Sequence, residues 1–174
     1  MLGIIGAMDE EVAKVKEQME DVETKQIASM EFLKGTVKGH PVVVVRSGIG
    51  KVNAAMCTQI LADIYHVDAV INTGIAGSLN ADINIGDIVL STDALEHDMD
   101  AMAFGYPVGQ IPRMDTLSFK ADEQLRETAK EICEKVNPDV TVFEGRVVSG
   151  DQFISDKQKK EWLIENFSGS CKGV

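Results

Sequence analysis

The chain has 174 residues, of which 44% are hydrophobic, and this composition is typical of one globular domain with a sizeable core. Its net charge of −11 argues against nucleic acids and anionic membrane surfaces as partners, because both attract basic patches. No apolar run reaches transmembrane length, and Cys57, Cys133 and Cys171 are too widely spaced to indicate disulfides or, with the histidines, a metal site. We therefore expect a cytoplasmic protein with reduced thiols and no bound metal.

Residues 3–12, GIIGAMDEEV, are predicted to form a buried strand that runs into a helix. Asp9 is the expected N-cap, and Val12, Val15 and Met19 follow at helical spacing. Three carboxylates thus lie where a strand ends and a helix begins, which is where open α/β sheets bind ligands. Considered alone, acids in a first turn more often only complement the helix dipole.

Strands and helices then alternate along the chain. Extended chain is expected over 25–37, strands over 41–45, 69–71, 86–95 and 140–149, helices over 51–65, 121–136 and 155–165, and a long loop over 96–118. This order predicts a single α/β domain over residues 1–174, with a mixed or mostly parallel sheet flanked by helices. Residues 8–11, 47–50, 73–78 and 149–154 all follow predicted strands, so they can meet at one edge of the sheet.

Two glycine-bearing loops, residues 47–55 (SGIGKVNAA) and 72–79 (NTGIAGSL), lie at such strand ends. The first is not a Walker A loop, because Val45 stands at the first glycine position and Val52 at the Ser/Thr position. Nor is it a dinucleotide-binding loop, since Asn53 replaces the third glycine. One such loop is more often a tight turn. Two of them, together with the acidic strand end and SGDQFI, favour a small-molecule site.

In order and spacing, five segments resemble the 5′-methylthioadenosine/S-adenosylhomocysteine nucleosidases of the nucleoside phosphorylase superfamily: GIIGAMDEEV, SGIGKVNAA, NTGIAGSL, HDMDAMAFGY and VSGDQFI. The resemblance runs from residue 2 to the last residue. It implies an N-glycosidase that uses water to release adenine and a thioribose product from both nucleosides. It also implies a homodimer of three-layer α/β/α sandwiches that needs no cofactor.

The resemblance also implies roles for individual residues. Glu11 matches the glutamate that orients and deprotonates the attacking water, and a helix N-terminus suits an ionised carboxylate there. Phe153 matches the aromatic ring that stacks on adenine, and Ile154 matches the residue whose backbone reads the polar edge of the base. The other residues that it places at the substrate are Met8 and Ile49 at the ribose and alkylthio group, Ala76 and Gly77 in the second glycine loop, and Phe104 and Pro112, which would reach into a partner subunit. For Met8 and Ile49, a plain core position is an open alternative.

Two departures from the family pattern affect these expectations. Ile75 stands where many members have serine. Members also continue through a VEMEG-type strand, whose glutamate binds the ribose hydroxyls, to an aspartate that protonates adenine, whereas this sequence ends at Val174. The resemblance thus implies a C-terminally truncated form with weak or no activity. A non-catalytic adenine-binding or nucleoside-binding fragment, a futalosine hydrolase and a nucleoside phosphorylase remain alternatives. The last is disfavoured, because Asn72 and Ile75 replace the arginine and serine of the phosphate-using relatives.

Apolar residues in the long loop 96–118 predict how the dimer forms. Met99, Met102, Phe104, Tyr106 and Pro112 give this loop an apolar character in an otherwise acidic protein. Such surfaces usually mark an interface, and closed twofold dimers are the commonest assembly. We expect the loop to be buried against a second copy of the chain.

Overall fold

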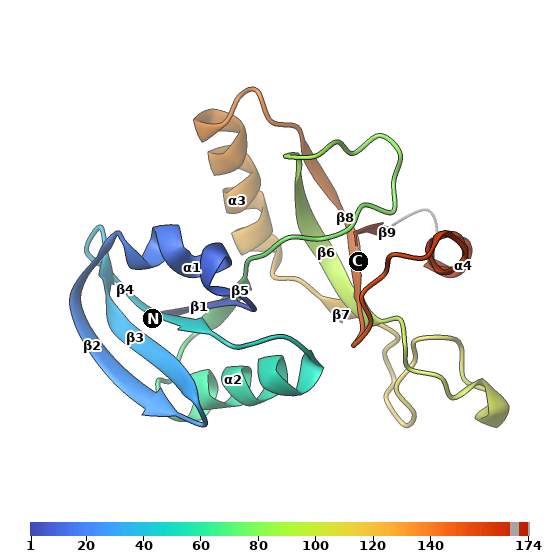
Figure 1. The fold of residues 1–174 in the computed structure, drawn as a ribbon, viewed down its shortest axis with the longest axis horizontal. Coiled ribbons are helices and arrows are strands. Elements are labelled where there is room, and N and C mark those ends of the chain that lie inside the picture. Colours follow the sequence, from blue (N-terminus) through green and yellow to red (C-terminus); the bar gives the residue numbers. More distant parts are fainter. Residues whose placement is uncertain (168–170, 174) are drawn as a thin grey trace. The chain divides into compact units, whose positions relative to one another are not determined.

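The computed structural model describes residues 1–167 and 171–173. The chain divides into two compact units, Met1–Ile75 and Ala76–Val174, and each has its own sheet, helices and core (Figure 1). Both units combine strands and helices, as the alternating sequence predicts. That the two form the single domain expected over residues 1–174 stays a prediction.

The first unit is built around a five-stranded sheet. Its elements are β1 (Leu2–Gly6), α1 (Asp9–Lys16), β2 (Met19–Ile27), β3 (Met30–Val37), β4 (His40–Arg46), α2 (Lys51–Asp63) and β5 (Ala69–Asn72). The strand order is β2-β3-β4-β1-β5, in which β1 runs parallel to β4 and β5, while β2, β3 and β4 are antiparallel neighbours.

Strand β4 explains why this sheet has a helix on each face. Residues 42–45 are four consecutive buried valines, and successive side chains of a strand point to opposite faces. Val43 and Val45 join a core with Cys57 and Leu61 of α2, whereas the other two valines pack with Val12 of α1. The first unit is therefore a three-layer α/β/α arrangement, and its valine run is buried on both sides, as in parallel sheets generally.

The thiol of Cys57 lies in the α2-side core and is fully buried. Desolvation by this burial raises the pKa of the thiol to about 11. Because only the thiolate is a good nucleophile, Cys57 is chemically inert in the folded protein.

The sequence-based expectations for residues 9–37 need three corrections. The N-cap of α1 is Met8 and not Asp9, which is the first helical residue. The helix ends at Lys16, and Met19 begins β2 instead of continuing α1. Met19 nevertheless packs against the core beneath α1, so its apolar side chain is used from a strand and the helical spacing was coincidental.

The extended stretch expected over residues 25–37 is a hairpin. Strands β2 and β3 pair in antiparallel fashion, and the turn consists of Ala28 and Ser29, with φ angles of 51° and 63°. Two-residue hairpin turns require positive φ at both positions and usually contain Asn or Gly. The sequence lacks those residues at the turn, which is why the hairpin was not predicted.

The second unit contains a four-stranded sheet. Its elements are β6 (Ile88–Glu96), the 3-10 turn η1 (Met102–Phe104), β7 (Phe119–Lys120), α3 (Glu123–Val136), β8 (Val142–Ser149), α4 (Lys157–Phe167) and β9 (Cys171–Gly173). The order is β7-β6-β8-β9, with β8 parallel to both of its neighbours. β6, β8, α3 and α4 agree with the predicted elements to within a few residues, and residues 97–118 form the expected long connection, whereas the short strands β7 and β9 were not predicted.

A buried apolar cluster and an ion pair hold the second unit together. Leu95 of β6 and Val148 of β8 pack with Leu163 of α4 in the apolar cluster. Asp93 accepts two hydrogen bonds from the Arg146 guanidinium, with Oδ1–Nε and Oδ2–Nη2 distances of 2.9 and 2.6 Å. The hydrogen bonds from Arg146 lower the pKa of Asp93, although burial acts in the opposite direction. This pair joins β6 to β8 directly.

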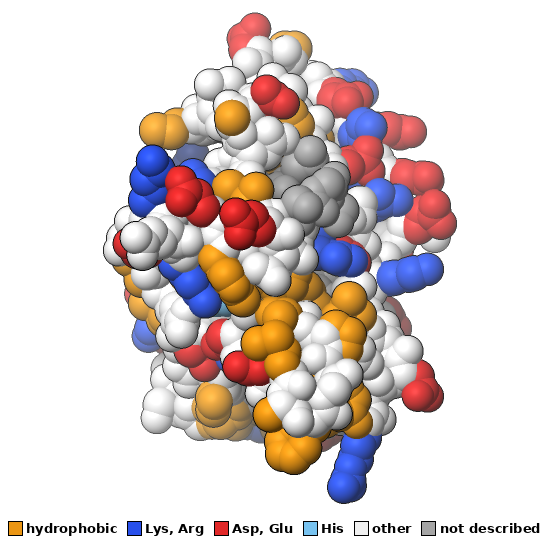
Figure 2. Space-filling model, turned by 90° about the vertical axis from the view of Figure 1, so that its right-hand side faces the viewer, with side chains coloured by type: hydrophobic (Ala, Val, Ile, Leu, Met, Phe, Trp, Pro, Cys, Tyr) orange, Lys and Arg blue, Asp and Glu red, His pale blue; other side chains and the backbone are white. Residues whose placement is uncertain are grey.

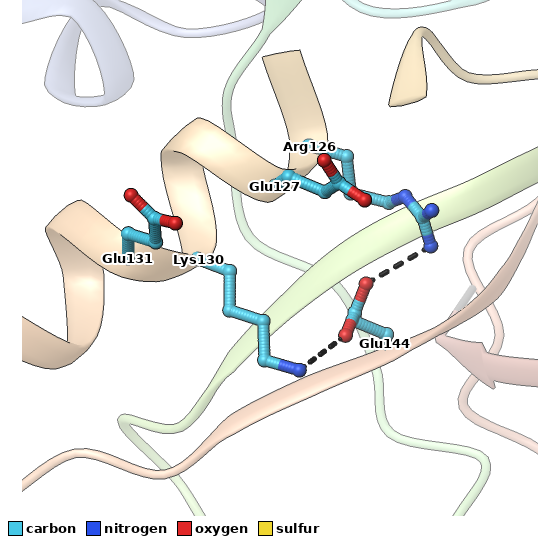
Figure 3. A pocket seen from close by; sticks show the side chains of 5 residues that line it. All are labelled: Arg126, Glu127, Lys130, Glu131 and Glu144. Carbon is cyan, nitrogen blue, oxygen red and sulfur yellow. Dashed lines mark hydrogen bonds and ion pairs between the residues drawn. The ribbon is translucent and has the colours of Figure 1, made fainter. Parts of the chain in front are cut away.

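A charged pocket lies between α3 and β8 (Figure 3). It is lined by Arg126, Glu127, Lys130, Glu131 and Glu144. The Glu144 carboxylate lies 2.9 Å from Nη1 of Arg126 and 2.6 Å from Nζ of Lys130. Its bond with Lys130 lowers the pKa of Glu144 and raises that of Lys130. The cations are thus neutralised within the pocket, and the cluster ties α3 to the sheet.

Candidate active site

The parallel strands of the first unit end side by side. The Ser47 N–H, just after β4, donates to the carbonyl of Gly6 at 2.9 Å, and the Thr73 N–H, just after β5, donates to that of Ile5 at 2.9 Å. The loops after β1, β4 and β5 therefore leave the sheet from the same edge, as expected for these three segments. The fourth segment, residues 149–154, instead follows β8 in the other sheet, so the expectation of one shared sheet edge is wrong for it.

Glu11 reaches this edge from the first turn of α1. Its Oε2 accepts the N–H of Met8 at 3.0 Å, and its Oε1 accepts the N–H of Ile75 at 3.1 Å. One bond caps the carboxylate's own helix, and the other joins it to the loop after β5. A carboxylate offers about four acceptor positions, so two of them are left for a ligand or a water molecule.

Gly74 makes room for this carboxylate, and Gly6 makes room for the side chains of Val12 and Glu11 in α1. A Cβ added to Gly74 would lie 2.6 Å from Oε1 of Glu11, and one added to Gly6 would lie 3.0 Å from Cβ of Glu11. Neither glycine has a φ in the left-handed region, so space and not backbone conformation requires them. We call the group formed by Gly6, Met8, Glu11, Gly74 and Ile75 the Glu11 junction.

The structure separates the three acids of the first turn. Asp9 lies 3.3 Å from Nε of Arg46 and 3.6 Å from Nζ of Lys16, and Glu10 is exposed. Successive helical residues point about 100° apart, so Glu11 is the acid of this turn that reaches the ends of β1 and β5. The helix-dipole explanation suits Asp9 and Glu10 but does not account for the two glycines packed against Glu11.

Other predicted residues of the first unit lie around the same strand ends. Ile49, in the loop after β4, is 75% exposed, which excludes the core alternative for this residue. Ile75 is 84% exposed, while its N–H is held by Glu11. Met8 is half-buried, so the core alternative stays open for that residue.

The second unit has a comparable meeting of strand ends. After β6 and β8, the His97 N–H donates to the carbonyl of Ser149 at 2.8 Å, and the Asp151 N–H donates to Oδ2 of Asp98 at 2.9 Å. A Cβ on Gly150 would lie 2.5 Å from Nε2 of the buried His97 and 2.9 Å from Cγ of Asp98. We call His97, Asp98, Gly150 and Asp151 the Asp98 junction. Sequence reasoning included HDMDAMAFGY among the family segments but assigned no role to Asp98.

The predicted base-binding residues follow the Asp98 junction directly. The Phe153 side chain is 96% exposed, whereas Ile154 is half-buried and packs against the apolar cluster of the second unit. An aromatic ring presented in this way is free to stack on a flat ligand. Ala76 and Gly77, at the start of the second unit, are exposed.

Phe104 and Pro112 lie in the long connection after β6. Both are exposed, and the Phe104 side chain is 83% exposed. Other exposed apolar residues of this stretch are Met102, Met114, Leu117 and Phe119. Figure 2 shows hydrophobic side chains gathered on the lower part of one face of the molecule.

Within the described ranges 1–167 and 171–173, no group of three or more His, Cys, Asp or Glu residues is arranged to hold a metal ion. No helix in this part of the chain is long and apolar enough to cross a membrane.

Comparisons with known proteins agree with the predicted resemblance. The family model described as Phosphorylase superfamily matches residues 1–173. The 5′-methylthioadenosine/S-adenosylhomocysteine nucleosidases of Bacillus thuringiensis (strain Al Hakam) and Bacillus cereus (strain B4264) are 43% identical to this chain over 166 residues, which cover 95% of this chain and 71% of each relative.

Solved structures give the same result. The nucleosidase of Colwellia psychrerythraea 34H in complex with adenine superposes with a TM-score of 0.92 at 38% identity, covering 99% of this chain and 72% of that one. The Neisseria meningitidis nucleosidase in complex with methylthio-immucillin-A superposes with a TM-score of 0.94 at 35% sequence identity, and the match covers 99% of this chain and 74% of that one. Futalosine hydrolase of Helicobacter pylori superposes with a TM-score of 0.90 at 33% sequence identity, and the match covers 99% of this chain and 73% of that one. The expected nucleoside phosphorylase type of α/β fold is thereby confirmed.

Proposed function

The chain belongs to the 5′-methylthioadenosine/S-adenosylhomocysteine nucleosidase family, and on this premise we propose that it hydrolyses the N-glycosidic bond of both nucleosides. The products are adenine and the corresponding thioribose. The observation that carries the proposal is the Glu11 carboxylate, which is fixed by the N–H groups of Met8 and Ile75 at the ends of parallel strands. A carboxylate held in this way can orient one water molecule and accept its proton.

In the proposed reaction the bond from C1′ of the ribose to adenine breaks, and its electron pair leaves with the base. The water oxygen bonds to C1′, one water proton passes to Glu11 and the other stays on the new hydroxyl group, and the departing adenine takes up a proton from the solvent, to which Glu11 later releases its own. Phe153 would stack on adenine, and the Ile154 backbone would bind its polar edge. Met8 and Ile49 would line the ribose and alkylthio side, Ala76 and Gly77 would contact the substrate from the second glycine loop, and Phe104 and Pro112 would be supplied by a second copy.

The geometry of the Glu11 junction favours water over phosphate as the nucleophile. The Ile75 N–H, a donor that an anion site would direct at phosphate, donates to the Glu11 carboxylate instead. A phosphate bound there would lie against a like charge, which disfavours its binding. We therefore expect a hydrolase and not a phosphorylase.

The test compares Glu11→Gln with Glu10→Gln. Glutamine keeps the size and the acceptor oxygen of Glu11 but cannot act as the base, so turnover should fall about 10²–10⁴-fold with little change in binding. Glu10 is exposed on the same helical turn, so its replacement should leave turnover unchanged. Adenine release is measured for both variants with and without phosphate. Equal turnover in the two variants would remove the role of Glu11, and dependence on phosphate would contradict hydrolysis.

Futalosine hydrolysis is the second candidate, because the Helicobacter pylori enzyme of that name is also a close structural relative. Turnover measured with futalosine and with methylthioadenosine in parallel distinguishes the two candidate activities. Adenine binding without any turnover would instead support the non-catalytic alternative.

We also place the protein in the cytoplasm as a homodimer. Support comes from the apolar stretch after β6, in which Met102 is 52% and Phe104 is 83% exposed. Exposed apolar surface of this kind favours burial against a second copy. Sedimentation of the parent and of Phe104→Ser at micromolar concentration tests this, and a monomeric parent would contradict it.

A further inference from the structure

We propose that Asp98 is a positioning residue for the base-binding loop, residues 150–154, which it holds to the end of β6 through the backbone of Asp151. The inference rests on the proposed function, because it assumes that Phe153 and Ile154 bind adenine. It adds a residue that acts on the base through the loop and touches neither the base nor the ribose.

The contacts at the end of β8 support this role. The Asp98 Oδ2 accepts the Asp151 N–H at 2.9 Å, across 53 positions of sequence. On the preceding residue, a Cβ added to Gly150 would lie 2.9 Å from Cγ of Asp98 and 2.5 Å from Nε2 of His97. The loop therefore begins in close contact with the two residues that follow β6. It has no space to shift toward them.

Fixing Asp151 matters because Phe153 follows only two residues later. The Phe153 side chain is 96% exposed, so packing does little to hold its ring. Ile154 is anchored on the far side, where it packs against the apolar cluster. The Asp98 bond and the Ile154 contact thus fix the two ends of a short segment. A ring presented by such a segment binds with a smaller loss of conformational freedom.

Asp98 also begins the segment that carries Phe104 and Pro112. That segment folds back on β6, since the Gly109 N–H donates to the carbonyl of Met99 at 3.0 Å and a Cβ on Gly109 would lie 2.9 Å from the Glu96 carbonyl oxygen. The stretch with Phe104 and Pro112 and the stretch with Phe153 and Ile154, both proposed to contact substrate, therefore leave the sheet of the second unit at the Asp98 junction.

Asp87 provides a matched control at the other end of the same two strands. Its Oδ1 accepts the Thr141 N–H at 3.2 Å, across 54 positions of sequence, just before β6 and β8 begin. Its other oxygen accepts the Asn84 N–H at 2.7 Å. Asp87 thus makes the same kind of bridge between the same strands but far along them from residues 150–154.

The experiment measures adenine affinity by calorimetry and backbone hydrogen exchange in the full chain. Asp98→Ala should weaken adenine binding about tenfold, the effect of losing one hydrogen bond to a charged group. It should also speed exchange of the Asp151 amide. Asp87→Ala should speed exchange at Thr141 and leave adenine affinity within about twofold of the parent, although it loses an equivalent bond.

Two further variants separate geometry from charge. Asp98→Asn keeps an acceptor oxygen at the same distance and should bind adenine almost as the parent does. Asp98→Glu keeps the charge but is one methylene longer, so it should displace the loop and weaken binding.

Equal adenine affinity for Asp98→Ala and Asp87→Ala would overturn the inference, as would normal binding by Asp98→Glu with weak binding by Asp98→Asn. Because Asp98→Asn and Asp98→Glu are the milder changes, they decide the matter if Asp98→Ala does not fold. If the parent itself neither binds adenine nor turns over, the proposed function fails and the inference with it.

Discussion

The Glu11 junction and the Asp98 junction are built in the same way. In each, a carboxylate accepts a backbone N–H from the loop that follows a neighbouring parallel strand. In each, a glycine of that loop lies so close that a Cβ would come within 2.6 Å of Oε1 of Glu11 or 2.9 Å of Cγ of Asp98. Both glycines are needed for space: Gly74 makes room for the Glu11 carboxylate, and Gly150 makes room for His97, whose Nε2 would lie 2.5 Å from an added Cβ, as well as for Asp98.

The surroundings of the two acids differ. Glu11 lies in the first turn of a helix and its two oxygens accept two N–H groups, one from Met8 and one from Ile75. Asp98 follows a strand and is next to His97, which is 1% exposed. In the roles proposed for them, the same arrangement presents a reactive group at Glu11 and fixes a loop at Asp98.

The largest effect after loss of Glu11 itself should come from Gly74→Ala. The new Cβ would lie 2.6 Å from Oε1 of Glu11, so the carboxylate must move. A displacement of about 1 Å at a reacting group can cost about 10²-fold, and we expect turnover to fall by that order while stability changes little. Adenine release and urea unfolding of the variant measure the two quantities.

Gly86→Ala is the control for this change. Gly86 has a φ of 98° and nothing within 4 Å of an added Cβ, so alanine there is strained but contacts nothing. It should lose about 1–2 kcal/mol of stability and keep its turnover. If Gly74→Ala kept full turnover, the close approach of this glycine to Glu11 would have no catalytic consequence.

A smaller effect, on stability, is expected at the ion pair between Asp93 of β6 and Arg146 of β8. Asp93→Asn replaces a paired carboxylate with an amide that cannot accept both guanidinium bonds, so unfolding at pH 7 should become easier by about 2 kcal/mol. Glu161→Gln is the control, because its partner Lys157 lies 3.6 Å away on an exposed helical turn. Such a pair contributes only a few tenths of a kcal/mol.

The pH dependence of this pair follows from the lowered pKa of Asp93. The pair stabilises the folded state fully above the unfolded-state pKa of aspartate, about 3.9, and this contribution is lost as the pH falls through the lower folded-state value. The parent should therefore lose stability below about pH 4 more steeply than Asp93→Asn does. Parallel curves in urea titrations from pH 6 to pH 2 would contradict this.

The smallest effect should come from the hairpin between β2 and β3. Ala28 and Ser29 both have positive φ, so Ala28→Asn combined with Ser29→Gly should stabilise the protein by about 0.5–1 kcal/mol. Turnover should stay unchanged, because this turn contributes nothing to the Glu11 junction. Thermal unfolding measures the gain, and a loss of stability would show that the turn is held by contacts beyond its backbone angles.

The sequence predicted elements well where apolar residues recur at regular spacing, even in α3, where no residue is buried. The valine run of β4 and the helical spacing in α2 and α3 depend on side-chain periodicity, which is visible in one sequence. It failed at Met19 and at the Ala28–Ser29 turn, because apolar spacing does not distinguish a helix from a strand entering the same core. A turn without Gly or Asn also cannot be recognised from its local sequence.

The candidate site shows the same contrast between features visible in local sequence and features that appear only in the folded chain. Glu11 was named from its place in a motif, and the structure brings it together with Met8 and Ile75. Asp98 was not named, because its hydrogen bond joins residues 53 positions apart and only the folded chain reveals such a contact. Gly150 was the available signal, but close approach and tight turning both select glycine, so its reason could not be read from sequence.

The buried thiol of Cys57 can report how often the core of the first unit opens to solvent. Because the side chain is fully buried and its pKa is about 11, an alkylating reagent can reach the thiolate only when the first unit opens. The labelling rate of Cys57, followed by mass spectrometry, therefore measures how often the core between α2 and the sheet opens under native conditions. A nucleoside bound at the Glu11 junction should slow that labelling, and the slowing would measure its affinity without any turnover assay.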